Sequence, residues 1–145
     1  MGFPAPVMTI EELSAFFVEA FPGVEPVKLN TILSIEQGRA RLALDPTGDM
    51  LRPGGIVSGP TQMGLADRAA YAVILGHIGP VAMAVTSNLN MSFLRAVPVR
   101  RIFADAVLLK LGRRLATVDV RLWQDDEAHP VAQATVTYAI PAATT

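Results

Sequence analysis

Residues 58–76 read SGPTQMGLADRAAYAVILG, and this stretch decides the fold. Ser58 is a residue type that caps the start of a helix, and Gly76 is a type that ends one. Between them, apolar residues occupy every side of the helix, and Asp67 and Arg68 are its only charges. A helix that is apolar all round is buried. The stretch therefore predicts a long helix enclosed by the rest of the chain.

The segments that flank this helix have the pattern of strands. Apolar and polar residues alternate in them, and turn-forming residues separate the runs. Two predicted strands precede the helix and four follow it: residues 27–36, 39–44, 81–95, 102–111, 115–123 and 131–140. One antiparallel sheet wrapped around one apolar helix is the simplest arrangement that buries both. We expect an α+β fold with a sheet of about six strands around a long central helix.

The chain before the first strand predicts a second, shorter helix. Thr9 and Glu12 have the spacing of a capping box, in which each side chain bonds the other residue's backbone. Apolar residues at helical spacing follow until a Phe-Pro-Gly sequence stops the pattern. Residues 1–24 are therefore expected to form a helix and arm within a single domain of residues 1–145. Proline and glycine mark residues 45–55 as a loop.

The composition excludes several classes of protein and favours an oligomer. The chain has 145 residues, of which 51% are hydrophobic and 17% charged, and this is too apolar for a disordered protein. It is also apolar for a monomer of this size, whose surface is large relative to its volume. A net charge of −1 implies no basic face, so we do not expect the chain to bind nucleic acid by neutralising its phosphates. Either the surface carries an apolar patch, or part of it is buried between copies of the chain. Because a single sheet leaves strand edges to pair, we expect the predicted strand at residues 81–95 to join its copy in a homodimer or a dimer of dimers.

Cysteine is absent, and the two histidines are His77 and His129. Disulfides, thiolate nucleophiles and metal cages of Cys and His are therefore not expected, and we predict neither a metal nor a separate cofactor. His77 falls at the predicted end of the long helix, where a cation interacts favourably with the helix dipole. No apolar run approaches the roughly eighteen residues of a membrane span, and the first residues lack a signal-peptide pattern. We expect a cytoplasmic protein without a membrane partner.

The region around the long helix resembles the PaaI-type acyl-CoA thioesterases of the hotdog fold. That family carries Asn-x-x-Gly-x-x-His-Gly-Gly, a helix with Leu-Ala-Asp, and a strand that ends near Phe-Leu-Arg-Pro. The matching stretches are residues 52–60 (RPGGIVSGP), Leu65-Ala66-Asp67 and Phe93-Leu94-Arg95, with weaker similarity at Gly112-Arg113 and residues 131–135. The similarity spans roughly residues 25 to 140. Three positions depart from the pattern: Arg52 replaces the Asn, Ser58 the His, and Pro60 the second Gly.

Asp67 and Gly59 are the leading catalytic candidates. A carboxylate in an apolar helix loses hydration, so Asp67 either faces the surface, pairs with Arg68 or Arg52, or serves as a base or nucleophile in a cleft. The start of the helix offers backbone N–H groups that can hold an oxyanion. Because Pro60 has no N–H group, the donor is Gly59 or Thr61. The resemblance implies that the Gly59-type and Asp67-type residues come from opposite subunits.

Ser58, Thr86, Asn88 and Asn90 are further candidates near this centre. Ser58 fits a helix cap better than a nucleophile, although its hydroxyl replaces the family's His and can do part of that work. The resemblance assigns to Thr86 a hydrogen bond to the attacking water. Asn88 and Asn90 have the same parity as Thr86 along the predicted strand, so we expect all three to line one cavity.

Four arginines are candidates for substrate binding: Arg52, Arg95, Arg113 and Arg114. Arginine binds phosphates well, although a solvated charge at a strand end is the more ordinary explanation for Arg95, Arg113 or Arg114 taken singly. The resemblance implies hydrolysis of a small or medium acyl-CoA, aromatic or aliphatic, to a free acid and coenzyme A. One alternative is a hotdog protein that binds acyl-CoA without turning it over. A hotdog hydratase or dehydratase ranks lower because it needs a histidine near the helix start.

Overall fold

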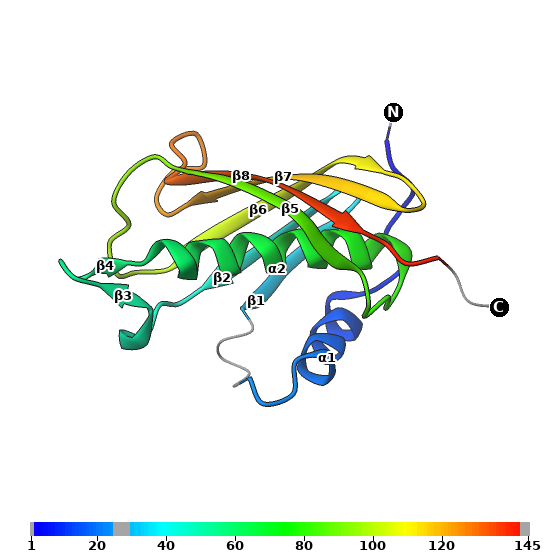
Figure 1. Cartoon of the computed structure of the whole chain (residues 1–145), viewed down its shortest axis with the longest axis horizontal. Coiled ribbons are helices and arrows are strands. Elements are labelled where there is room, and N and C mark those ends of the chain that lie inside the picture. The colour runs from blue at the N-terminus through cyan, green and yellow to red at the C-terminus, as the bar shows by residue number, and fades with distance from the viewer. Residues whose placement is uncertain (1, 25–29, 143–145) are drawn as a thin grey trace.

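The computed structural model describes residues 2–24 and 30–142, which form two α-helices and a six-stranded sheet. The helices are α1 (Ile10–Ala20) and α2 (Gly59–Ile78). The strands of the large sheet are β1 (Thr31–Glu36), β2 (Arg39–Leu44), β5 (Val85–Phe93), β6 (Ile102–Leu111), β7 (Leu115–Trp123) and β8 (Ala132–Ala139). Figure 1 shows α2 lying along the concave face of this sheet. The predicted α+β architecture is confirmed.

The strand order of the sheet is β1-β2-β6-β7-β8-β5, and all neighbours are antiparallel. Strands β6, β7 and β8 alternate between buried and partly exposed residues, as strands with one face on a core do. Strands β1 and β5 are the two edges. The residues of β5 are exposed along most of its length, so this edge lacks the cover that native proteins normally give to a strand edge.

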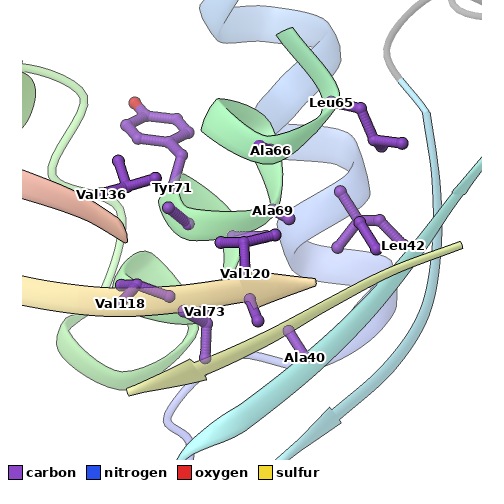
Figure 2. Packing of buried hydrophobic residues seen from close by; sticks show 14 of the residues in the cluster. Ala40, Leu42, Leu65, Ala66, Ala69, Tyr71, Val73, Val118, Val120 and Val136 are labelled. Atoms are coloured by element: carbon purple, nitrogen blue, oxygen red, sulfur yellow. The ribbon is translucent and has the colours of Figure 1, made fainter. Parts of the chain in front are cut away.

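Helix α2 packs against the sheet through small and branched side chains. Ala69 and Val73 lie on the side of α2 that faces the strands, near Leu42 and Val120 (Figure 2), and Ala66 belongs to the same buried cluster. Alanine at these positions lets the sheet approach the helix closely, and each large aliphatic side chain buried in the core contributes about 1.5–3 kcal/mol. The core formed here is continuous across the domain.

Helix α1 covers one half of α2 and leaves the other half open. The predicted capping box is present: Glu12 N donates to the Thr9 hydroxyl, and Thr9 N donates to the Glu12 carboxylate. Phe17 packs on Tyr71 with ring centroids 5.6 Å apart. The C-terminal half of α2 is therefore enclosed, whereas the residues before Tyr71 include a partly exposed stripe. The expectation that α2 is buried all round is wrong for this first half.

The end of α2 differs from the prediction. The helix passes through Gly76 and ends at Ile78, and Gly79 terminates it with a φ of 101°. The N–H of Gly79 donates to the Leu75 carbonyl. Gly76 is needed for close packing instead, because a Cβ there would stand 3.3 Å from the Ile35 side chain. The glycine that fits a left-handed cap lies three residues later than the sequence pattern indicated.

The other differences concern strand ends and one loop. The predicted loop at residues 45–55 contains a short 3₁₀ helix (Gly48–Met50) and part of a small hairpin, β3 (Leu51–Arg52) and β4 (Ile56–Val57). The first predicted strand begins at Thr31, and its residues 27–29 lie outside the described residues. The predicted strands at 81–95 and 131–140 are shorter by a few residues at their ends. Pairing with the neighbouring strand decides these limits.

His77 is buried and has a different role from the one expected. Its Nε2 accepts a hydrogen bond of 2.8 Å from the Gly38 N–H, and its Nδ1 lies 2.7 Å from the Val73 carbonyl. An N–H can only donate and a carbonyl can only accept, so these partners fix a neutral imidazole with its proton on Nδ1. His77 therefore stabilises the turn between β1 and β2 by accepting the hydrogen bond from Gly38, and it does not act as a cation at the helix end. No helix within the described residues is long and apolar enough to cross a membrane.

Candidate active site

Asp67 lies on the open half of α2 and is held by two hydroxyl groups. Thr86 of β5 donates a hydrogen bond of 2.6 Å to Asp67 Oδ1. The Tyr138 hydroxyl lies 2.8 Å from the same oxygen and 3.2 Å from the Asp67 carbonyl oxygen. Within the described residues nothing donates to Oδ2. The arrangement fixes the carboxylate in one orientation and keeps one of its oxygens available.

Tyr138 is a site residue that the sequence analysis missed. It is an inward-facing residue of β8, directly opposite Thr86 in the pairing of β8 with β5. Burial raises the pKa of the Tyr138 phenol well above its usual value, and the nearby Asp67 carboxylate raises it further. Tyr138 therefore stays protonated and acts as a donor. A tyrosine at an inward position of a strand was the available signal, since a buried phenol hydroxyl needs a polar partner.

A cavity of about 320 Å³ opens beside Asp67, and we call it the Asp67 cavity. Its walls are largely aromatic and aliphatic, and the rings of Phe21, Tyr71 and Tyr138 follow one another with centroids 5.9 and 5.7 Å apart. Its lining residues are Phe21, Asp67, Arg68, Tyr71, Ala82, Ala84, Val85, Thr86 and Tyr138. An oriented carboxylate at the edge of an apolar cavity is a typical arrangement of a catalytic base or nucleophile.

Asp67 is not neutralised by an arginine of its own chain. Arg68 is the next residue on the helix, but no ion pair joins the two side chains among the described residues, and the Arg68 Nε donates instead to Asn30 Oδ1. Arg52 lines a different cavity and has its Nε 3.3 Å from the Pro53 carbonyl. Of the alternatives left open by the sequence, pairing with Arg68 or Arg52 is therefore wrong.

The first turn of α2 presents one backbone donor. Ser58 caps the helix: its hydroxyl accepts from the Thr61 N–H at 3.3 Å and lies 2.9 Å from the Thr61 hydroxyl. Gln62 N donates to the Ser58 carbonyl, and Pro60 has no N–H group. Among the described residues nothing accepts from the Gly59 N–H. Of Gly59 and Thr61, the two donors that the sequence allowed, only Gly59 has an unused N–H group.

Gly59 borders a second cavity, of about 450 Å³, which we call the Gly59 cavity. The Phe93 ring covers Gly59, since a Cβ on this residue would stand 3.4 Å from the ring. Two of the predicted substrate-binding arginines, Arg52 and Arg95, lie on its rim. The full lining is Arg52, Ile56, Val57, Gly59, Gln62, Phe93, Leu94, Arg95, Ala96 and Val97. The cavity combines a free amide with a cationic rim.

The two cavities do not meet within one chain. Gly59 and Asp67 are eight residues apart on one helix, which corresponds to about 12 Å along the helix axis. No residue that the structure describes lines both cavities. A reacting carbonyl cannot contact the Gly59 amide and the Asp67 carboxylate of the same subunit at once.

The prediction that Thr86, Asn88 and Asn90 line one cavity is wrong. A β-bulge lies between Thr86 and Asn88 in the pairing of β5 with β8, so Ser87 is an extra residue. Thr86 is opposite the inward-facing Tyr138, whereas Asn88 and Asn90 are opposite Thr137 and Thr135 on the outer face of the sheet. One inserted residue reverses the parity of a strand. Neither asparagine lines either cavity.

The predicted phosphate-binding arginines lie at opposite ends of the sheet. Arg113 and Arg114 are exposed in the turn between β6 and β7, and Arg114 Nε donates to the Ile140 carbonyl. This turn adjoins the Val85 end of β5, because Leu115, Ala139 and Val85 are in register. Arg95 follows the other end of β5. One subunit therefore does not gather Arg95, Arg113 and Arg114 around one ligand.

The comparison with family models decides the family. Residues 54–131, which include α2 and both cavities' central residues, match the model of the thioesterase superfamily. The chain belongs to the thioesterase superfamily. No curated protein matches it.

Solved structures place this thioesterase-superfamily chain among the PaaI-like hotdog proteins. A candidate thioesterase from Silicibacter sp. TM1040 is 39% identical, with a TM-score of 0.83 over 97% of this chain and 96% of that one. A candidate thioesterase from Ralstonia eutropha JMP134, related to phenylacetic acid degradation, is 26% identical, with a TM-score of 0.75 over 86% and 98%. A Streptococcus mutans UA159 protein solved with acetyl-CoA shares the fold at 21% identity, with a TM-score of 0.69 over 80% and 91%. The resemblance noted in the sequence is confirmed.

Proposed function

We propose that this protein hydrolyses acyl-CoA thioesters in a site formed by two copies of the chain. The observation that carries the proposal is the Asp67 carboxylate, with Oδ1 fixed by Thr86 and Tyr138 and Oδ2 available beside an apolar cavity. Family membership supports thioester chemistry. The acetyl-CoA-bound neighbour of the same fold supports coenzyme A as the carrier.

The exposed edge of the sheet supports a two-fold dimer. Val85, Phe93 and Leu94 expose about half of their surface along or just after β5, and Met63 of α2 is also exposed. Antiparallel pairing of β5 with its copy covers this apolar edge. A two-fold axis through the middle of β5 brings the Thr86 end of one strand beside the Phe93 end of the other. Because Thr86 bonds Asp67 and Phe93 covers Gly59, the two cavities then face each other across the interface.

In this site each group has a defined task. The free Gly59 N–H, at the positive end of the α2 dipole, donates to the thioester oxygen as negative charge develops on it. Asp67 Oδ2 either takes a proton from water as the water attacks the carbonyl carbon, or attacks that carbon itself. In the first route the C–S bond breaks, the proton taken from water passes to the departing sulfur, and the free acid forms directly. In the second route the C–S bond breaks to give a mixed anhydride on Asp67, and water then hydrolyses this anhydride to release the free acid, restore the carboxylate and supply the proton of the coenzyme A thiol. The Thr86 hydroxyl donates its hydrogen bond to Asp67 Oδ1, so its oxygen can accept a hydrogen bond from the water.

The arginines on the rim are proposed to bind the phosphates of coenzyme A. Arg52 and Arg95 border the Gly59 cavity of one subunit. Arg113 and Arg114 adjoin the Val85 end of β5, which the two-fold pairing brings toward the other subunit's Arg95. Ser58 contributes through its cap, which holds the first turn of α2 and leaves the Gly59 N–H unused.

The experiment is hydrolysis of a panel of short acyl-CoA substrates by the wild type and by Asp67→Asn. We expect the wild type to release free thiol and Asp67→Asn to lower kcat by about 10²–10⁴-fold, because the amide neither removes a proton nor attacks. Asp119→Asn makes the same change on the outer face, where Gln133 and Arg121 bind that carboxylate, and serves as the matched control.

Absence of hydrolysis by the wild type, with tight binding of the same acyl-CoA substrates, would establish the non-catalytic alternative. Hydrolysis undiminished in Asp67→Asn would remove Asp67 from the mechanism. The hydratase alternative lacks its base in the described residues: His77 is buried against Gly38, and His129 bonds Asp126 in a surface turn.

A further inference from the structure

Among the described residues that line the Asp67 cavity, Arg68 is the one cation. It comes directly after Asp67 on α2 and is half-buried. Its Nε donates to Asn30 Oδ1 at 2.5 Å, and its guanidinium lies over Gly64, where a Cβ would stand 3.2 Å from Nη2. Asn30 thus fixes one edge of the guanidinium, and the absence of a side chain on Gly64 leaves room for the guanidinium to lie over the helix.

The outer edge of this guanidinium has no hydrogen-bond acceptor among the described residues. No residue described in the structure accepts a hydrogen bond from Nη1 or Nη2, and no carboxylate of this part of the chain forms an ion pair with it. Burial lowers the pKa of Arg68, and the neighbouring Asp67 carboxylate opposes this only in part, so the fold holds this cation against a desolvation cost. A fixed, partly desolvated guanidinium with free donors binds a carboxylate through two parallel hydrogen bonds.

We infer that the Asp67 cavity selects acyl groups that end in a carboxylate, and that Arg68 binds that carboxylate. The inference rests on the proposed function, because it takes Asp67 as the residue that meets the thioester carbonyl. Asp67 and Arg68 line the same cavity, and the Asp67 carboxylate is close enough to raise the pKa of Arg68. An anion that Arg68 binds in this cavity therefore lies close to the thioester carbonyl that Asp67 meets.

This short separation between the bound anion and the thioester carbonyl excludes the phosphates of coenzyme A as the anion. The whole pantetheine arm separates them from the sulfur, so they cannot lie at Arg68 while the thioester lies at Asp67. A short dicarboxylic acyl group, such as succinyl or glutaryl, has its carboxylate at a suitable separation. The aromatic and alanine walls of the cavity accommodate its methylene groups.

The test compares succinyl-CoA with butyryl-CoA, which have the same chain length and differ in a terminal carboxylate against a methyl group. The readout is the ratio of the two kcat/KM values. We expect the wild type to favour succinyl-CoA by at least about tenfold, as the loss of hydrogen bonds to a buried charge predicts. Arg68→Met removes the charge and should bring the ratio to one or below, while Arg68→Lys should retain part of the preference.

Arg121→Met is the matched control, because Arg121 lies on the outer face of the sheet and bonds Asp119. It should leave the ratio at the wild-type value. A wild type that favours butyryl-CoA or treats both alike overturns the inference, although the proposed function then stands. An equal loss of both activities in Arg68→Met also overturns it, since that result indicates a structural role.

A binding experiment separates failure of the inference from failure of the proposed function. If the wild type hydrolyses neither substrate, the proposed function fails, and the dissociation constants of the two acyl-CoA compounds decide the inference. Tighter binding of succinyl-CoA that Arg68→Met abolishes supports it. Equal dissociation constants overturn it.

Discussion

The Gly59 cavity and the Asp67 cavity lie along the same helix but are built from different groups. The first presents a backbone N–H from the helix start, beneath the Phe93 ring and beside arginines. The second presents side chains in the middle of the helix: a carboxylate, two hydroxyls and a guanidinium between aromatic rings. In the proposed function, the positive helix end and the acidic middle of the helix are complementary halves of one site.

The difference between the two cavities is the reason for proposing a site made from two copies of the chain. An oxyanion donor and a base must both lie within hydrogen-bond distance of one reacting carbonyl. A straight helix keeps its first turn and its third turn apart by about 12 Å. The exposed β5 edge offers a route to bring one half of each subunit against the other half of its partner.

The largest effect is expected from Gly59→Pro, in which a ring carbon replaces the hydrogen of the Gly59 N–H group, so that this donor is lost. Proline is favourable at the first position of a helix, and Ser58 already has the extended backbone that precedes a proline. We expect kcat to fall by about 10²–10³-fold, the usual cost of one oxyanion donor. Gly59→Ala keeps the N–H group, and its Cβ meets Phe93 at an ordinary contact distance. A thermal unfolding curve confirms that both variants fold.

Equal activities of Gly59→Pro and Gly59→Ala would show that the amide is not the donor. Mixing subunits of Gly59→Pro and Asp67→Asn then tests whether the cavities combine across the interface. A mixed dimer has one intact site if Gly59 and Asp67 act from opposite subunits, and an equal mixture should regain about one quarter of wild-type activity. No recovery in a sample shown to contain mixed dimers contradicts the shared site.

A smaller effect is expected from Tyr138→Phe, which removes one donor from Asp67 Oδ1 and leaves Thr86 in place. Hydrogen bonds to charged groups contribute about 1.5–3 kcal/mol, so we expect kcat to fall by roughly 10–100-fold. Tyr71→Phe is the control, because the Tyr71 hydroxyl donates to the Ala82 carbonyl within the same cavity. If kcat falls by the same factor in both variants, the loss comes from the altered cavity wall and not from the missing hydrogen bond to the Asp67 carboxylate.

The smallest effect is on stability at alkaline pH. Burial raises the pKa of both Tyr71 and Tyr138, whereas in the unfolded chain each ionises near the usual value of about 10. The stabilisation is therefore complete below about pH 10 and is lost as pH rises toward the folded values. The free energy of unfolding should fall above pH 10 by up to about 1.4 kcal/mol per pH unit for each tyrosine.

Urea unfolding at several alkaline pH values measures this slope. Tyr138→Phe should make it shallower, and the remaining slope belongs to Tyr71 and to groups elsewhere. An unchanged slope would mean that Tyr138 ionises alike in the folded and unfolded states.

Much of the fold follows from local patterns in the sequence. Strands β2, β6 and β7 begin and end where their alternation predicts, because each has one face on the core. The end of α2 was less predictable: Gly76 and Gly79 are both helix terminators by type, and contact with Ile35 decides between them. The two-stranded hairpin β3–β4 is too short for a pattern to appear in the sequence.

The placement of a candidate residue was predictable where it depends on that residue's own position on the helix. The roles proposed for Asp67, Gly59 and Ser58 follow from an apolar helix and its first turn. Asn88 and Asn90 were assigned to the wrong face because a bulge at Ser87 leaves no sign in the residue types. Tyr138 was missed because its partner, Asp67, is 71 residues away in the chain.

The sequence by itself determined the buried helix, the strands around it and a carboxylate in an apolar setting, because spacing and residue type encode each of these. Only the tertiary structure decided which groups meet that carboxylate, which N–H group of α2 is unused and which strand edge is open. These depend on the register between strands and on contacts between distant segments. A shift of one residue in that register turns a side chain from the cavity to the opposite face.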